Sequence, residues 1–312
     1  MVTRIRPRGP FSLVASTAFL EGFTPAAYTA PAEGGHLHLA FPLDGRDAVA
    51  AVCATQPGGD DAPVMIEAVV DGNAPESAAV DHLTRILSLD VDGTDYPAVG
   101  ERDPVIGRLQ DRYRGLRPVL FASPYEAAAW TLIGARIAIR QAARVKHRMA
   151  AELGTELTIH GDRIAAFPGP GRLGALDTFQ GLFGRKAEYL RGLAEATVQG
   201  RLDAANLRAM PEADALESLR TIPGVGPFSA ELILLRGVGL VDRAPVNEPR
   251  FAQAVTFAYD RDEPSAAELS EITERWRPFR TWVTVLLRTH LEESTHEIRH
   301  GGRVQRAGRA VG

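Results

Sequence analysis

Hydrophobic and polar positions partly alternate in the first third of the chain, with the two-residue period of half-buried strands. We predict strands over residues 11–15, 36–41, 47–54 and 64–70. Asp44 and Gly45 lie between the second and third of these segments and are typical of a hairpin turn. Residues 78–89 instead have the apolar spacing of a helix. This order predicts a small antiparallel sheet with a helix.

From Pro104 onward the apolar positions follow helical spacing. Ser123 before Pro124 is typical of an N-cap followed by proline in the first turn, and we predict a helix from there to Gly134. Residues 164–171 end in a Pro- and Gly-rich stretch and are predicted to form a loop. Further helices are predicted over residues 137–153, 188–197, 212–219, 228–236, 249–257, 266–276 and 278–292.

These patterns divide the chain into three parts. We predict an α+β domain at residues 1–103, with a small antiparallel β-sheet, and an all-α domain at residues 104–299. Residues 300–312 are rich in Gly and Arg and are predicted to be a mobile basic tail. The whole chain of 312 residues is 45% hydrophobic and 24% charged, which suits a globular protein with a buried core.

Composition also excludes several kinds of site. Cys53 is the only cysteine, so there is no internal disulfide and no cluster of thiolate ligands. His36 and His38 alternate on one predicted strand, but no cysteine or carboxylate stands at metal spacing, and we expect no zinc site. No apolar run reaches about 18 residues and no basic-then-apolar leader is present. We therefore expect a cytoplasmic protein without membrane contact.

The most informative segment covers residues 219–230 and reads Leu-Arg-Thr-Ile-Pro-Gly-Val-Gly-Pro-Phe-Ser-Ala. It predicts a helix end, a tight turn and a second helix. Glycines in the turn permit positive φ and the close approach of another backbone. The amides there and at the start of the second helix form a donor-rich, partly positive end that suits a DNA backbone phosphate. The predicted phosphate-binding residues are Gly224, Val225, Gly226, Phe228 and Ser229.

This segment resembles the helix-hairpin-helix of the DNA glycosylase superfamily that includes endonuclease III. Flanking segments follow the order of its 3-methyladenine DNA glycosylase II (AlkA-type) branch, from about Arg112 to Leu291 and more loosely over the N-terminal part. They read Gly115-Leu116-Arg117-Pro118, Ser123-Pro124-Tyr125-Glu126, Pro245-Val246-Asn247-Glu248 and Trp276-Arg277-Pro278-Phe279. The resemblance implies an N-terminal α+β domain before an all-α helix-hairpin-helix glycosylase core.

The resemblance implies a monofunctional DNA glycosylase of base-excision repair, acting as a monomer on double-stranded DNA that contains damaged bases. Such an enzyme flips a base out of the duplex and hydrolyses its N-glycosidic bond. The net charge of −4 is unusual for a DNA-binding protein. However, an acidic early part is followed by an arginine-rich part over residues 108–148, which is compatible with one DNA-facing module.

In this family a carboxylate at the start of the helix after the hairpin stabilises the sugar cation. We assign this role to Glu248, with Asn247 beside it, because Phe251 then falls on the core face of the helix. The other register puts Asn247 at the catalytic position and leaves no carboxylate there. Alternatively, Glu248 only favours the helix N-terminus. Glu in place of the family's Asp shifts the carboxylate by more than about 1 Å, which can cost about 10²-fold in rate.

Other positions depart from the family. Phe228 stands where bifunctional lyases carry a Schiff-base lysine, and it either packs in the core or lines the base pocket. Arg136, after Ala135, either fills the gap left by the flipped base or is an exposed or phosphate-binding arginine. Arg288 stands near the family's stacking aromatic and either faces the pocket or solvent. We place Trp130 in the pocket as well.

The resemblance also bears on cofactors. With one cysteine, the four-cysteine iron–sulfur cluster of some branches is excluded. We expect no organic cofactor, although the backbone of Ile222 and Val225 could hold Na⁺ or K⁺ beside the phosphate. Arg220 and Arg236 flank the hairpin and are either phosphate contacts or solvated.

Three functions stay open at this point. The first is a monofunctional glycosylase that uses Glu248. The second is a catalytically weakened or inactive protein of the same fold that binds lesions or abasic DNA. The third is a glycosylase of altered lesion specificity, which the two pocket arginine candidates motivate. Which lesion is recognised does not follow from the residues.

Overall fold

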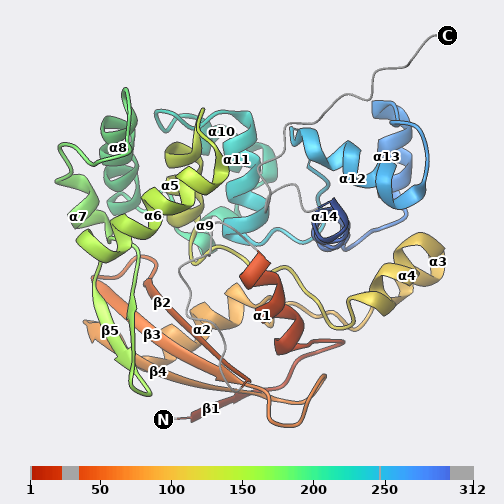
Figure 1. Cartoon of the computed structure of the whole chain (residues 1–312), viewed down its shortest axis with the longest axis horizontal. Coiled ribbons are helices and arrows are strands. Elements are labelled where there is room, and N and C mark those ends of the chain that lie inside the picture. Colours follow the sequence, from red (N-terminus) through yellow and green to blue (C-terminus); the bar gives the residue numbers. More distant parts are fainter. Residues whose placement is uncertain (1, 23–34, 246, 296–312) are drawn as a thin grey trace.

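The computed structural model describes residues 2–22, 35–245 and 247–295. Figure 1 shows a small sheet at one end of the molecule, with a larger group of helices above it. The predicted tail at residues 300–312 lies outside the described residues. No helix within the described ranges is long and apolar enough to cross a lipid bilayer.

The N-terminal sheet is antiparallel with the strand order β1-β4-β3-β2. Three of the four predicted strands are confirmed, and the first strand of the sheet was not predicted. Helix α2 and a preceding helix, α1, pack their apolar residues on one face of the sheet. The elements are β1 (Val2–Ile5), α1 (Leu13–Gly22), β2 (His36–Pro42), β3 (Ala48–Thr55), β4 (Val64–Gly72) and α2 (Glu76–Ile86).

The prediction of a strand over residues 11–15 is wrong, because this segment leads into helix α1. The Ser12 Oγ accepts a hydrogen bond from the Ala15 amide at 3.2 Å, as an N-cap side chain does. A window of five residues is too short to separate a strand from the first turn of a helix by apolar period. Leu13 and Leu20 then join the core between the sheet and helices α1 and α2.

The predicted helices beyond residue 104 are confirmed, and the Ser123 Oγ caps α5 by accepting from the Glu126 amide at 2.9 Å. One short helix precedes residue 104, and the predicted helix over residues 228–236 ends as a π-helix, η3. The elements are α3 (Pro97–Arg102), α4 (Pro104–Arg112), α5 (Pro124–Gly134), α6 (Ile139–Leu153), α7 (Pro170–Gly174), α8 (Lys186–Val198), α9 (Ala204–Ala209), α10 (Glu212–Arg220), α11 (Pro227–Leu232), η3 (Ile233–Val238), α12 (Pro249–Tyr259), α13 (Ala266–Glu274) and α14 (Arg280–Thr295).

The helical part is not all-α, which corrects the predicted fold class. A two-stranded hairpin, β5 (Glu156–Ile159) and β6 (Asp162–Ala165), interrupts it and takes up the start of the predicted loop at residues 164–171. Its Leu157, Ile159 and Ile164 pack against Ala51 and Cys53 of β3. The hairpin therefore covers the face of the sheet that α1 and α2 leave open. Figure 1 shows it reaching down from α6 to the sheet.

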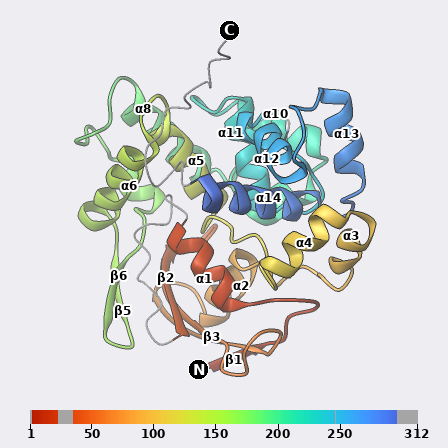
Figure 2. The same ribbon diagram turned by 45° about the vertical axis from the view of Figure 1, so that its right-hand side comes forward.

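Three large apolar cores hold the molecule together. One lies between the sheet and helices α1 and α2, one joins α5, α6, α8 and α10 to η3, and one joins α3 and α4 to α12, α13 and α14. Figure 2 shows α14 across the middle of the molecule, between α12 and the α1–α4 side. Tyr96 and Val99 pack in the third core although they precede the proposed boundary at residue 103, and that boundary stays a prediction.

The buried Arg117 guanidinium connects the loop before α1, the segment after α2, and α14. Its Nε donates to the Pro10 carbonyl at 2.8 Å, and its Nη1 donates to the Ser88 carbonyl at 2.9 Å. The guanidinium also lies 5.1 Å from the ring centre of Trp282 on α14. An arginine with several carbonyl acceptors meets the hydrogen-bonding demand of burial, which explains a charged side chain in this position.

Candidate active site

The hairpin between α10 and α11 is built around Gly224, which has φ +87°. A Cβ at this glycine would lie 2.7 Å from Leu132 Cδ2 and 2.9 Å from the Tyr189 ring. The turn closes with a hydrogen bond of 3.0 Å from the Val225 amide to the Ile222 carbonyl. Gly224 is therefore required by both its backbone conformation and its packing.

Gly226 has a different role in the same hairpin. It is the N-cap residue of α11, and its backbone is extended with φ −91°. Glycine has no side chain that could cap the helix. A Cβ at this position would meet nothing within 4 Å. The first amides of a helix have no acceptor within the helix. Those of α11, which belong to Phe228 and Ser229, are therefore suited to an outside anion.

Glu231 of α11 fixes the segment that follows the hairpin. Its carboxylate is 3% exposed and accepts from the Asn247 amide at 2.8 Å and from Arg243 Nη2 at 3.0 Å. These bonds hold the backbone immediately before Glu248. Sequence reasoning missed Glu231, although a lone carboxylate within the apolar run of residues 230–235 was a usable signal.

Glu248 is the N-cap residue of α12, and its side chain makes no capping hydrogen bond. Its Oε1 instead lies 3.2 Å from Arg288 Nη1 on α14, with exposed side-chain fractions of 27% and 22%. Phe251, Ala254 and Val255 are buried. The predicted core face of α12 is thus confirmed, while the catalytic role of Glu248 stays a prediction.

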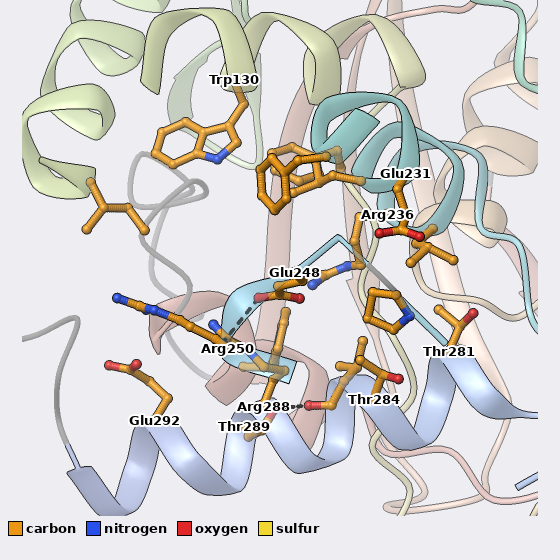
Figure 3. Close-up of a pocket in the computed structure, with 18 of the residues that line it drawn as sticks. Trp130, Glu231, Arg236, Glu248, Arg250, Thr281, Thr284, Arg288, Thr289 and Glu292 are labelled. Carbon is orange, nitrogen blue, oxygen red and sulfur yellow. Dashed lines mark hydrogen bonds and ion pairs between the residues drawn. The ribbon is translucent and has the colours of Figure 1, made fainter. Parts of the chain in front are cut away.

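A cavity of about 380 Å³ opens in front of Glu248. Its volume is within the range of small-molecule sites. Its walls come from α1, α5, α11, η3 and α14, and Figure 3 shows Glu248 pointing into it between Arg236 and Arg288. Residues that line it include Phe19, Phe121, Trp130, Phe228, Glu231, Leu232, Leu235, Arg236, Glu248, Arg250, Thr281, Thr284, Val285 and Arg288.

Arg236 of η3 lies in the wall of this cavity, so it is neither a phosphate contact beside the hairpin nor a solvated side chain. Its Nη2 donates to the Val119 carbonyl at 2.8 Å, and its guanidinium lies 5.3 Å from the ring centre of Phe19. Burial lowers the pKa of Arg236 to about 10, an effect that Glu248 opposes and Arg288 reinforces. Arg236 stays cationic at neutral pH and faces the same carboxylate as Arg288.

Comparisons with known proteins support the resemblance to DNA glycosylases that the sequence predicts. No family model matches the sequence. The chain is 24% identical over 213 residues to the DNA-3-methyladenine glycosylase of Bacillus subtilis, a match covering 67% of this chain and 70% of that protein. It is 27% identical over 181 residues to DNA-3-methyladenine glycosylase 2 of Escherichia coli, covering 57% of this chain and 61% of the relative.

Solved structures extend the likeness to the whole fold. The 3-methyladenine DNA-glycosylase of Archaeoglobus fulgidus has a TM-score of 0.76 at 24% identity, covering 94% of this chain and 99% of that one. The 8-oxoguanine glycosylase/lyase of Clostridium acetobutylicum, solved with double-stranded DNA, has a TM-score of 0.67 at 18% identity, covering 94% and 98%. The chain resembles the DNA-3-methyladenine glycosylases in sequence and in fold.

The predicted resemblance to the AlkA-type branch of the helix-hairpin-helix glycosylases is therefore confirmed. The names of the relatives also confirm the predicted enzyme class, that of hydrolytic N-glycosylases. The mixed helix and sheet content agrees with the glycosylase fold. The roles of single residues are not tested by these likenesses and stay predictions.

The structure brings some of the predicted glycosylase site residues together and separates others. Trp130, Phe228 and Arg288 line the cavity with Glu248. Phe228 is 42% exposed, so it is a cavity wall and not a core residue. Ala135 and Arg136 are exposed just beyond α5 and lie outside the set that lines the cavity, and Arg136 has φ +58°. A gap-filling role for Arg136 stays a prediction.

Proposed function

We propose that the protein is a hydrolytic DNA glycosylase of base-excision repair, which releases a damaged base flipped out of double-stranded DNA. The single observation that carries this proposal is the position of Glu248. Its carboxylate lies in a cavity large enough for a nucleobase, on the helix that follows the helix-hairpin-helix. The relatives and the DNA-bound structure neighbours support the same partner.

In the proposed mechanism, the α11 amides after Gly226 hold a backbone phosphate, and the flipped base enters the cavity beside Trp130 and Phe228. The glycosidic bond breaks with its electron pair leaving on the base. The Glu248 carboxylate stabilises the sugar cation, and water adds to the anomeric carbon while its proton passes to this carboxylate. Asn247 positions this carboxylate through the hydrogen bond that its backbone amide donates to the Glu231 carboxylate. The backbone at Ile222 and Val225 is our proposed site for a monovalent cation.

The pair between Glu248 and Arg288 favours a particular lesion class. Arg288 pairs with the carboxylate but places a second positive charge at the base-binding cavity, near Arg236. A cationic methylpurine about 4 Å from one of these guanidinium groups would be repelled by about 4 kcal/mol at protein-surface screening, a cost that the Glu248 and Glu292 carboxylates in the cavity wall offset in part. We therefore propose a glycosylase of altered specificity, which prefers neutral damaged bases such as deaminated or etheno purines.

A release assay over duplexes that carry single lesions tests this proposal. We expect single-turnover release of a neutral lesion, such as hypoxanthine, to exceed release of 7-methylguanine. The Arg288→Trp variant removes a positive charge and adds a stacking surface, so it should shift the preference toward the cationic base. Arg275→Trp, at an exposed position, is the control. Equal preferences in wild type and Arg288→Trp would contradict the proposed specificity.

The Glu248→Asp variant separates a retuned glycosylase from a weakened one. In a site built for glutamate, the shorter side chain should lower release by about 10²-fold, because the carboxylate recedes by more than 1 Å. A large gain in release would instead favour the weakened protein. The wild-type protein could instead bind lesion-containing or abasic DNA tightly and release no base from any duplex of the panel. This result would show a DNA-binding protein without activity and would overturn the proposal of a glycosylase.

A further inference from the structure

Four side chains with metal-binding atoms converge on the face of the sheet that the β5–β6 hairpin covers, outside the cavity in front of Glu248. They are His36, His38, Cys53 and His160, and their donor atoms all lie within 4.8 Å of one another. The first two are on β2, Cys53 is on β3, and His160 is in the turn between β5 and β6. The helical part of the chain thus completes a cluster that begins in the N-terminal sheet.

The strand register explains the convergence. His38 pairs directly with Cys53 across β2 and β3, and His36 is two residues along, on the same face. The β5–β6 hairpin packs on this face through Leu157 and Ile159. The three imidazole ring centres are then 5.6 to 6.1 Å apart, each pair edge-on.

His38 carries an independent sign of a missing ligand. It is 7% exposed, and its Nε2 is buried without a hydrogen-bond partner within the described residues. Its other ring nitrogen, Nδ1, lies 2.7 Å from Asp162 Oδ2. A carboxylate on one imidazole nitrogen sets the tautomer so that the other nitrogen can ligate a metal, as in carboxylate–histidine–zinc arrangements. A buried polar atom with no partner is otherwise costly.

The spacing also fits a tetrahedral ion. Zn–N bonds of about 2.0–2.1 Å and a Zn–S bond of about 2.3 Å place neighbouring ligand atoms roughly 3.3–3.7 Å apart. His36 Nδ1 is already 3.4 Å from Cys53 Sγ. Small rotations of His36 and His160, the two exposed ligands, would close the remaining distances.

We propose that His36, His38, Cys53 and His160 bind one Zn²⁺ as a closed structural site that fastens the β5–β6 hairpin to the N-terminal sheet. Three imidazoles and a thiolate are soft-to-intermediate donors that select zinc over Mg²⁺ or Ca²⁺. Four protein ligands leave no open position for substrate, so the ion is structural. The proposal replaces our expectation of no zinc site, which considered spacing along the sequence alone.

Nearby carboxylates balance the charge of the proposed ion. Asp162 orients His38, and Glu67 Oε2 lies 3.3 Å from His160 Nε2. Without a metal, burial and these two carboxylates raise the pKa of the Cys53 thiol to about 11. Zinc would displace the thiol proton, because a coordinating thiol is deprotonated by the cation.

The metal content of the full-length protein, without a histidine tag, tests the proposal. After expression with zinc in the medium and extensive dialysis, elemental analysis should find one zinc per chain. Replacement by Co²⁺ should produce a cobalt–thiolate charge-transfer band and the visible absorption of tetrahedral Co²⁺. A wild-type protein that retains no zinc and gives only the spectrum of octahedral Co²⁺ would overturn the site.

Variants identify the ligands. Cys53→Ser should abolish the charge-transfer band, and His160→Gln should weaken Co²⁺ binding while the band persists. Asp162→Asn should lower Co²⁺ affinity by about 10–100-fold, the usual effect of losing the partner of a ligating histidine. His147→Gln, at an exposed histidine of α6, is the matched control and should bind as wild type. An unchanged band in Cys53→Ser would overturn the assigned ligand set.

Discussion

The cavity in front of Glu248 and the histidine–cysteine cluster are two candidate sites that form in opposite ways. The hairpin beside the cavity is one continuous segment, residues 219–230, whose turn depends on Gly224. The cluster takes its four side chains from three separate segments between His36 and His160, two of them from β2. A site presented by a local turn can be recognised along the sequence. A site formed by packing of distant strands becomes visible only when their register is known.

The largest expected effect concerns Glu248. Glu248→Gln keeps the shape of the side chain but removes the charge that would stabilise the sugar cation, so we expect base release to fall by about 10²–10³-fold. Single-turnover release from a lesion-containing duplex measures the effect. Glu263→Gln, at an exposed position between α12 and α13, should keep the wild-type rate. A wild-type rate in Glu248→Gln would remove the carboxylate from the mechanism.

The second prediction concerns His82, which lies on α2 where the sheet meets the helices and is 8% exposed. Burial, aided by Arg85, lowers the pKa of His82 to about 3. In the unfolded chain this pKa is about 6.5. The stability from neutral His82 is therefore present above pH 6.5 and decreases as the pH falls toward 3. By pH 5 the loss in the free energy of unfolding is about 2 kcal/mol.

Urea unfolding at pH 7.5 and pH 5 measures the effect of His82. His82→Phe should reduce the difference between the two free energies, whereas the exposed His147→Gln should keep it. If His82→Phe retains the full wild-type pH dependence, the loss of stability at low pH does not come from protonation of His82.

The third prediction compares the two hairpin glycines. Gly226→Ala meets no neighbouring atom, so stability should stay within about 0.5 kcal/mol. Its methyl group would nevertheless stand at the amides of α11, and we expect DNA affinity to fall about tenfold, the equivalent of one charge-assisted hydrogen bond. Gly224→Ala should instead lose about 1–3 kcal/mol of stability, because its φ is +87°. Fluorescence anisotropy and urea unfolding distinguish these effects, and full affinity in Gly226→Ala would remove the phosphate from this position.

The smallest expected effect links the two sites. If zinc is structural, a chelator should lower the Tm by at least about 1–2 °C, the shift that 1 kcal/mol causes at about 2.1 cal/mol/K of unfolding entropy per residue over 312 residues. Release of the base at 25 °C should change by less than about twofold, because separate sites act independently. The Cys53→Ser variant should show no effect of the chelator on Tm. A chelator that lowered the rate of base release severalfold as well as the Tm would mean that the ion supports the cavity in front of Glu248 directly.

Much of the helical part was predictable from local signals. The cap at Ser123, the hairpin glycines and the apolar face of α12 at Phe251 depend on residues within a few positions of one another. The same register identified Glu248 at the start of α12. Predictions from short segments were wrong where the apolar period was ambiguous, as in the segment that begins α1. They also missed the hairpin of β5 and β6, which interrupts a helical stretch.

The sequence alone determined most of the helices, the glycine turn of the hairpin and the position of the candidate carboxylate, because each of these depends on backbone conformation within a few turns. Only the tertiary structure decided which side chains meet. It paired Glu248 with Arg288, placed Arg236 in the cavity wall, and brought His160 to Cys53. Such contacts depend on the packing of elements far apart in the chain, and neither composition nor spacing encodes the distance between them.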